Sequence, residues 1–154
     1  MADFATTPIA RGKLTIKGLQ GKSIEEGFVQ DAQGKTSFNP DIIKEGGAIL
    51  PLGSDPLHGS HKGYCLGSMV DILSAVLPGA SFGPFVPPQV PFLDPPAEKV
   101  GTGLGHFFGA MRIDAFQDKK DFKNHMDKWI ETFRKAEPIK GEPKVMIPGD
   151  PERA

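Results

Sequence analysis

The chain has 154 residues, with 18 basic and 19 acidic side chains and a formal net charge of −1 at pH 7. This length suits one domain with its own core, and the balanced charge gives no reason to expect a nucleic acid or an acidic membrane surface as partner. The single cysteine, Cys65, excludes an internal disulfide and favours a reducing, cytoplasmic setting, and no apolar run is long enough to span a membrane.

The first third predicts a helix followed by short extended pieces. Residues 8–19 predict a helix, because Pro8 suits a first helical turn and Ile9, Leu14 and Ile16 supply apolar contacts. Turn signals at Glu26-Gly27 and Gln33-Gly34 then separate short extended pieces around residues 28–30 and 36–38.

Residues 61–77 give the strongest helical pattern in the chain. Ser60 is placed to cap this helix, and Pro78-Gly79 is placed to end it. Lys62 and Asp71 are its only charged residues and fall on opposite sides. Because apolar residues occur all round, we expect a helix that is buried on every side. They are Leu66, Met69, Val70, Leu73, Val76 and Leu77.

The remaining elements follow a loop-rich middle. Residues 84–99 form a Pro-rich loop, and residues 106–113 predict a strand that is apolar on both faces and internal to a sheet. Residues 118–136 predict an amphipathic helix, and residues 145–147 predict a short strand that leads into a turn. The helix has one apolar stripe, which we expect to face the core: Phe122, Met126, Trp129 and Phe133. The fold class is therefore α/β, with a mixed, largely antiparallel sheet.

One segment, Gly59 to Tyr64, has the composition of an anion site. Lys62 falls in the first helical turn, where a cation opposes the helix dipole but can join the backbone N–H groups in binding an anion. Gly59 and Gly63 can let a ligand approach the backbone closely. The alternative is a solvated lysine on a glycine-rich helix start, and the pattern leaves both open.

Other patterns favour ordinary structural roles. Gly101 to Gly105 reads G-x-G-x-G, which lacks the spacing and the strand-to-helix context of a dinucleotide fingerprint. His58 and His61 lack the further ligands of a metal site, so we predict none. We expect Cys65 to be inert packing. The Pro-x-x-Pro spacings within residues 84–91 favour a rigid loop over a polyproline ligand.

Several motifs in a fixed order resemble the malate/L-lactate dehydrogenase family, NAD(P)-dependent oxidoreductases unrelated to the Rossmann enzymes. This family includes ureidoglycolate dehydrogenase and diketogulonate reductase. Each motif is weak alone, but the ordered series spans nearly all of residues 1–154. The motifs are D-F-A-T-T at 3–7, A-R-G-K at 10–13, L-P-L-G at 50–53, H-K-G-Y at 61–64, M-V-D-I-L-S at 69–74 and P-G-D-P-E at 148–152.

The resemblance implies NAD or NADP as cofactor and a small 2-hydroxy or 2-keto acid as substrate. It also implies the family's own cofactor-binding fold and a homodimer. It assigns cofactor contacts to three blocks, which supply Asp3, Phe4, Ala5, Thr6, Thr7, His61, Lys62, Gly149 and Asp150.

The family's catalytic histidine lies in an R-x-D-x-H-G type motif, and no part of this sequence matches it. We therefore assign no catalytic residue and expect residues 1–154 to correspond to the C-terminal half of such an enzyme, with little turnover alone. The alternative is a truncated or split, non-catalytic chain that acts only as a binding or assembly partner.

Overall fold

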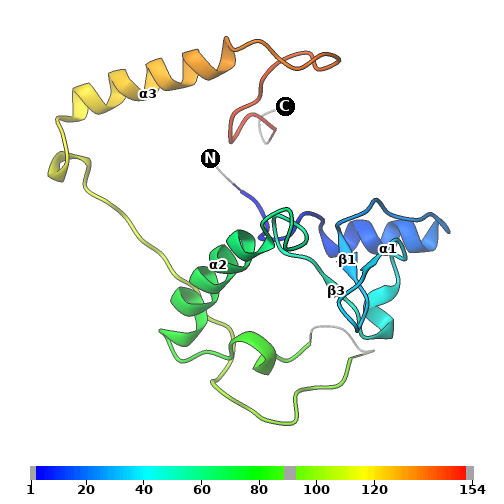
Figure 1. The fold of residues 1–154 in the computed structure, drawn as a ribbon. Coiled ribbons are helices and arrows are strands. Elements are labelled where there is room, and N and C mark those ends of the chain that lie inside the picture. The colour runs from blue at the N-terminus through cyan, green and yellow to red at the C-terminus, as the bar shows by residue number, and fades with distance from the viewer. Residues whose placement is uncertain (1–2, 89–92, 152–154) are drawn as a thin grey trace. The chain divides into compact units, whose positions relative to one another are not determined.

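The structure is a computed structural model that describes residues 3–88 and 93–151 (Figure 1). Its contacts divide the chain into two compact units, one of residues 5–107 and one that joins residues 1–4 to 108–154. None of the described helices is both long and apolar enough to cross a membrane.

The larger unit begins with helix α1, Arg11–Leu19, packed on a small antiparallel sheet. The sheet has the order β2-β1-β3, made of Thr36–Ser37, Val29–Gln30 and Ala48–Ile49. Val29 pairs with Ser37 on one side and with Ile49 on the other. A core cluster joins helix and sheet: Ile9, Leu14, Ile24, Val29 and Ile42. The predicted helix and extended pieces are confirmed, although the helix starts at Arg11 and leaves Pro8 outside it.

The predicted turns shape this sheet. Between β1 and β2 the Asp31 carboxylate accepts hydrogen bonds from the N–H groups of Gln33 and Lys35, both at 2.9 Å. Gly34 has φ = 82°, a conformation that glycine adopts without the steric cost of a side chain. The turn predicted at Gln33-Gly34 is thus confirmed.

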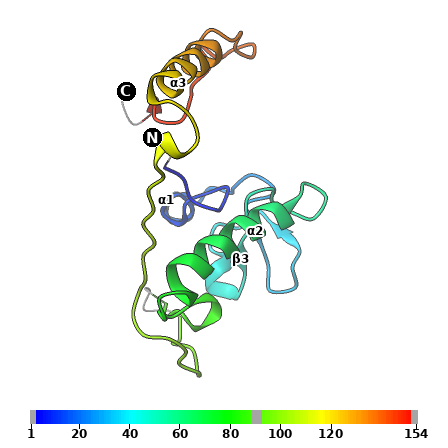
Figure 2. The ribbon, with the colours of Figure 1, turned by 90° about the vertical axis from the view of Figure 1, so that its left-hand side faces the viewer.

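Helix α2, Ser60–Asp71, continues without a break into a π-helical turn, Ile72–Val76 (Figures 1 and 2). The predicted helix is confirmed, but its predicted cap is wrong. Gly59 occupies the flanking position with φ = 87°, and Ser60 is already helical and makes no side-chain cap.

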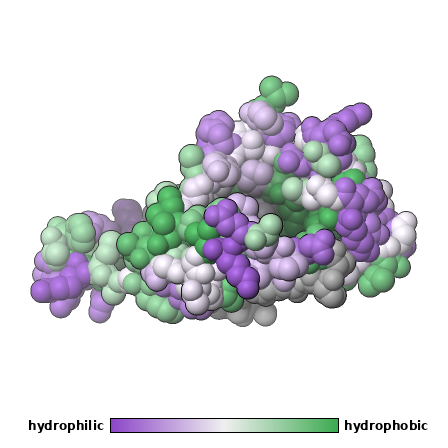
Figure 3. Space-filling view, turned by 90° about the horizontal axis from the view of Figure 1, so that it is seen from below, coloured by the Kyte–Doolittle hydropathy of each residue, from purple (hydrophilic) through white to green (hydrophobic). Residues whose placement is uncertain are grey.

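The expectation that this helix is buried on every side is also wrong. Within α2 only Gly63 is buried, and Cys65 is exposed rather than packed. Large apolar side chains on it face solvent, and hydrophobic patches lie open on the face drawn in Figure 3. The exposed ones are Met69, Val70, Ile72, Leu73, Val76 and Leu77. The apolar pattern predicts that these side chains pack against other apolar residues, but the described residues do not cover them.

The smaller unit contains helix α3, Lys119–Arg134. Asp118 caps it, because its carboxylate accepts a hydrogen bond from the Lys120 N–H at 2.7 Å. The predicted helix is confirmed, but no residue of α3 is buried, so the prediction of a core-facing stripe is wrong. The rings of Trp129 and Phe133 pack against each other with their centroids 4.6 Å apart and their planes tilted by 47°.

Two predicted strands are absent from the described chain. Residues 106–113 and 145–147 have no strand pairing, and Phe108 is 88% exposed. A strand needs a neighbour to satisfy its backbone, and the described sheet contains only β1, β2 and β3. The Pro-rich loop has a short 3-10 turn at Gly83–Phe85 and is otherwise irregular where described, while residues 89–92 lie outside the described residues.

Candidate functional site

The candidate site lies at the start of α2, which a strained loop positions. Gly53, Ser54 and Gly59 all have positive φ, at 89°, 59° and 87°. Ser54 is the only described residue other than glycine in this conformation. Backbone strain at a non-glycine residue is typical of segments that are held for a function.

Two of the amides at the start of α2 already have partners. The Ser60 N–H donates to the Asp55 carbonyl at 3.0 Å, and the Lys62 N–H donates to the Gly59 carbonyl at 2.9 Å. The sequence predicted that such groups are free for an anion, and for these two amides that is wrong. The remaining attraction for an anion comes from the helix dipole and the Lys62 ammonium.

Lys62 is exposed and folds back over the start of its own helix. Its Nζ lies 3.8 Å from the position that a Cβ on Gly59 would take. The salt bridges of the described residues do not include Lys62. This side chain is thus a cation that the described chain leaves uncompensated.

Gly63 has a different role from the one predicted. A Cβ on Gly63 would lie 2.1 Å from the Leu52 carbonyl oxygen and 2.6 Å from the Leu52 nitrogen. The missing side chain therefore lets α2 pack on the chain at Leu52 and does not open the backbone to a ligand.

The N-terminal segment joins the same packing. The Leu52 N–H donates to the Thr6 carbonyl at 3.0 Å, and a Cβ on Gly67 would lie 3.7 Å from Thr6 Oγ1. Thr7 Oγ1 donates to the Ile9 carbonyl at 3.0 Å. Two of the blocks singled out by sequence, Ala5–Thr7 and the α2 start, therefore lie in one packed unit. Asp3 and Phe4 are exposed and fall in the other unit.

A pocket of about 400 Å³ opens beside the start of α2. Two aromatic side chains from the helix, His61 and Tyr64, line it together with Asp55 from the preceding loop. Neither Asp55 nor Tyr64 is among the residues predicted from the sequence to contact the cofactor. Helical spacing could have found Tyr64, since it follows His61 by three residues and shares its face.

Asp55 is held by His58. The His58 Nδ1 lies 2.9 Å from both carboxylate oxygens, and the His58 N–H donates to Oδ1 at 3.0 Å. These contacts from His58 lower the pKa of Asp55 below its ordinary value, so the group is a carboxylate at neutral pH. Groups of three or more residues able to hold a metal do not occur among the residues described.

The turn at Gly149-Asp150 is confirmed, but Asp150 already has partners. The Arg134 Nη2 contacts its Oδ1 at 2.5 Å, and the Ile147 N–H donates to its Oδ2 at 3.1 Å. The Arg134 guanidinium, helped by that N–H, lowers the pKa of Asp150. This side chain fastens the turn to α3 within the smaller unit.

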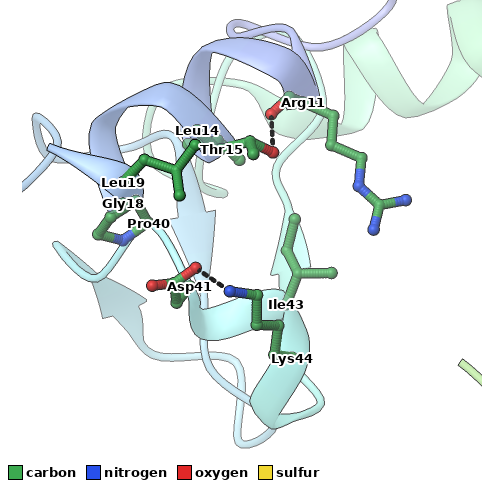
Figure 4. A pocket seen from close by; sticks show the side chains of 9 residues that line it. All are labelled: Arg11, Leu14, Thr15, Gly18, Leu19, Pro40, Asp41, Ile43 and Lys44. Carbon is green, nitrogen blue, oxygen red and sulfur yellow. Dashed lines mark hydrogen bonds and ion pairs between the residues drawn. The ribbon is translucent and has the colours of Figure 1, made fainter. Parts of the chain in front are cut away.

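A second pocket of about 250 Å³ lies between α1 and the 3-10 turn Ile42–Glu45 (Figure 4). Lys44 Nζ pairs with Asp41 Oδ1 at 2.6 Å across it, and Thr15 Oγ1 donates to the Arg11 carbonyl. None of the residues predicted to bind a cofactor lines this pocket.

Comparison with known proteins identifies the family. The model of the malate/L-lactate dehydrogenase family matches residues 1–154. The chain belongs to this family. The sequence resemblance is thereby confirmed.

Three members of the family illustrate the match. Malate dehydrogenase of Pyrococcus horikoshii is 34% identical over 137 residues, which are 88% of this chain and 36% of that protein. L-sulfolactate dehydrogenase of Methanothermobacter thermautotrophicus is 35% identical over 97% of this chain and 38% of its own length. The solved structure of malate dehydrogenase from Entamoeba histolytica matches with a TM-score of 0.73 and 27% identity, over 98% of this chain and 42% of that one.

The chain thus spans about two fifths of the length of its curated malate/L-lactate dehydrogenase relatives. The family's fold is shared along the whole chain, which supports the α/β class with helices and a small antiparallel sheet. The assignment of this stretch to the C-terminal half stays a prediction from the order of motifs.

Proposed function

We propose that the chain is part of an NAD(P)-dependent oxidoreductase that interconverts a 2-hydroxy acid and a 2-keto acid, as relatives named malate and sulfolactate dehydrogenase suggest. The observation that carries the proposal is the exposed, uncompensated Lys62 at the start of α2, a helix that approaches Thr6 at Gly67. The donor set fits a dinucleotide, because an ammonium and a helix dipole both favour its phosphates. When bound, the nicotinamide supplies or accepts a hydride.

The chain's own residues would bind and orient that cofactor. Lys62 attracts a phosphate, His61 lies one residue away, and the small side chains of Ala5, Thr6 and Thr7 permit close approach. The turn at Gly149-Asp150 is a further proposed contact, along with Asp3 and Phe4. In the parent fold we propose a mixed, largely antiparallel sheet that extends the three strands seen here, in a cytoplasmic protein.

The binding proposal is tested by titrating the full chain with NADH and NADPH and following nucleotide fluorescence. Lys62→Ala should weaken binding roughly tenfold, because a charge-assisted contact to phosphate is lost. Lys13→Ala is the matched control, since it removes an exposed lysine from α1. Unchanged binding in the Lys62 variant, or equal loss in both variants, would overturn the role of Lys62.

The chemical step needs a proton donor that we assign to no residue of this chain. His58 is paired with Asp55, and His125 Nδ1 lies 3.2 Å from Gln117 Oε1. We therefore expect little or no turnover from purified 1–154 with malate or lactate, even where NADH binds. Robust turnover would contradict this expectation.

A second candidate function is assembly without catalysis. The exposed apolar residues of α2 favour it, because a large apolar surface left open marks a contact with another chain or segment. The contact could be a homodimer, as the family resemblance implies, or a polypeptide that supplies the remaining part of the fold. A chain that binds neither nucleotide but still associates would support this candidate.

A further inference from the structure

The pocket beside α2 is lined by both apolar and polar residues. Its apolar residues are Ile49, Leu50, Pro51 and Pro56, and its polar ones include Gln30, Thr36, Ser54, Asp55 and Ser60. Its volume of about 400 Å³ falls in the range of about 300–1,000 Å³ that small-molecule sites show. This mixture suits a ligand with one flat apolar part and one hydroxyl-bearing part.

Two rings on α2 face this pocket. His61 and Tyr64 are three residues apart, so they lie on one face of the helix. Tyr64 is 71% exposed, which leaves its ring open to a ligand. Aromatic side chains of this kind stack on planar bases whatever the base sequence.

A carboxylate completes the lining. Asp55 lies in the loop before α2, and two contacts from His58 fix its orientation. Its side chain is 30% exposed, so oxygen lone pairs stay accessible. An acidic side chain that accepts from a ribose 2′-hydroxyl favours NAD, while the same charge repels the 2′-phosphate of NADP.

We propose that this pocket receives the adenosine half of the dinucleotide, with the base against Tyr64 and His61 and the ribose toward Asp55, and that it selects NAD over NADP. This inference rests on the proposed function and adds the cofactor preference to it. Lys62 does not line the pocket, and its ammonium lies near Gly59 at the start of the same helix, where it is available to the phosphates of a dinucleotide.

The first test needs no variant. The full chain is titrated with 5′-AMP and with adenosine 2′,5′-bisphosphate, and heats of binding are recorded. We expect 5′-AMP to bind at least roughly tenfold more tightly, because Asp55 repels the second phosphate. Equal affinity or a preference for the bisphosphate would overturn the inferred selectivity.

The second test separates stacking from charge. Tyr64→Ala should weaken 5′-AMP and NADH binding roughly tenfold, and Tyr64→Phe should keep it near wild type, because the phenyl ring still stacks. Asp55→Asn should lower the ratio of the NADPH to the NADH dissociation constant roughly tenfold. Circular dichroism and thermal melting confirm that each variant is folded.

The outcomes distinguish this inference from the proposed function. If NADH binds through Lys62 but the Tyr64→Ala variant binds NADH like wild type, the pocket assignment is wrong and the proposed function stands. If 5′-AMP binds through Tyr64 while neither dinucleotide binds, the pocket takes an adenosine group, but the proposed function and the dinucleotide assignment both fail. Failure of 5′-AMP, NADH and NADPH to bind overturns both.

Discussion

At the scale of single residues, Gly63 decides how closely α2 approaches the chain at Leu52. We expect Gly63→Ala to lower the free energy of unfolding by at least about 2 kcal/mol, because its Cβ would lie 2.1 Å from a backbone oxygen that no side-chain rotation can move. Urea denaturation followed by circular dichroism measures the loss.

Gly12→Ala in α1 is the matched control for this prediction. A Cβ on Gly12 would meet no atom within 4 Å, and alanine is the better helix former. This variant should unfold at the wild-type urea concentration or above it. If Gly63→Ala is as stable as Gly12→Ala, the close packing at Leu52 is wrong.

The residues of the candidate site were predictable to different degrees. The sequence singles out Lys62 because its charge conflicts with the helix dipole, a conflict that is visible without the fold. The role predicted for Gly63, close approach of a ligand, was wrong because the sequence does not show that the backbone at Leu52 packs against this position of the helix. Asp55 was missed because only folding brings its loop to the same pocket as Tyr64.

At the scale of elements, Asp150 fastens the C-terminal turn to α3 through Arg134. The folded-state pKa of Asp150 lies below its ordinary value of 3.8 because Arg134 and the Ile147 N–H donate to the carboxylate. The contact therefore stabilises the turn above about pH 4 and is lost as the pH falls through the lowered pKa. Amide exchange at Ile147 reports it directly.

We expect Asp150→Asn to reduce protection of the Ile147 amide roughly tenfold at neutral pH, and to remove the further loss of protection in acid that wild type shows. Asp127→Asn, at an exposed carboxylate on α3, is the control and should leave Ile147 unchanged. Equal protection in both variants, or a wild-type signal flat with pH, would contradict the role of Asp150.

Helices and turns, whose hydrogen bonds join residues close in the sequence, were predicted best. Helices α2 and α3 follow from apolar spacing, and the β1–β2 turn follows from Gln33-Gly34. Burial and strand pairing were predicted wrongly at 106–113 and on α2, because both depend on neighbours far away in the sequence. An apolar pattern indicates that a side chain favours burial, but it does not show whether another segment covers that side chain.

At the scale of the whole molecule, most buried hydrophobic residues among those described come before residue 51, while Val70 of α2 is 52% exposed and Leu77, directly after the π-helical turn, is 68% exposed. Apolar surface of this extent drives association. We therefore expect the chain to self-associate at micromolar concentration in sedimentation velocity. Replacing Val70 and Leu77 together by lysine should weaken association at least roughly tenfold, because charges on that face must be desolvated.

The matched control, Ile16→Lys with Leu19→Lys on exposed positions of α1, should associate like wild type. A monomeric wild type, or equal loss in both double variants, would show that this face of α2 does not mediate association.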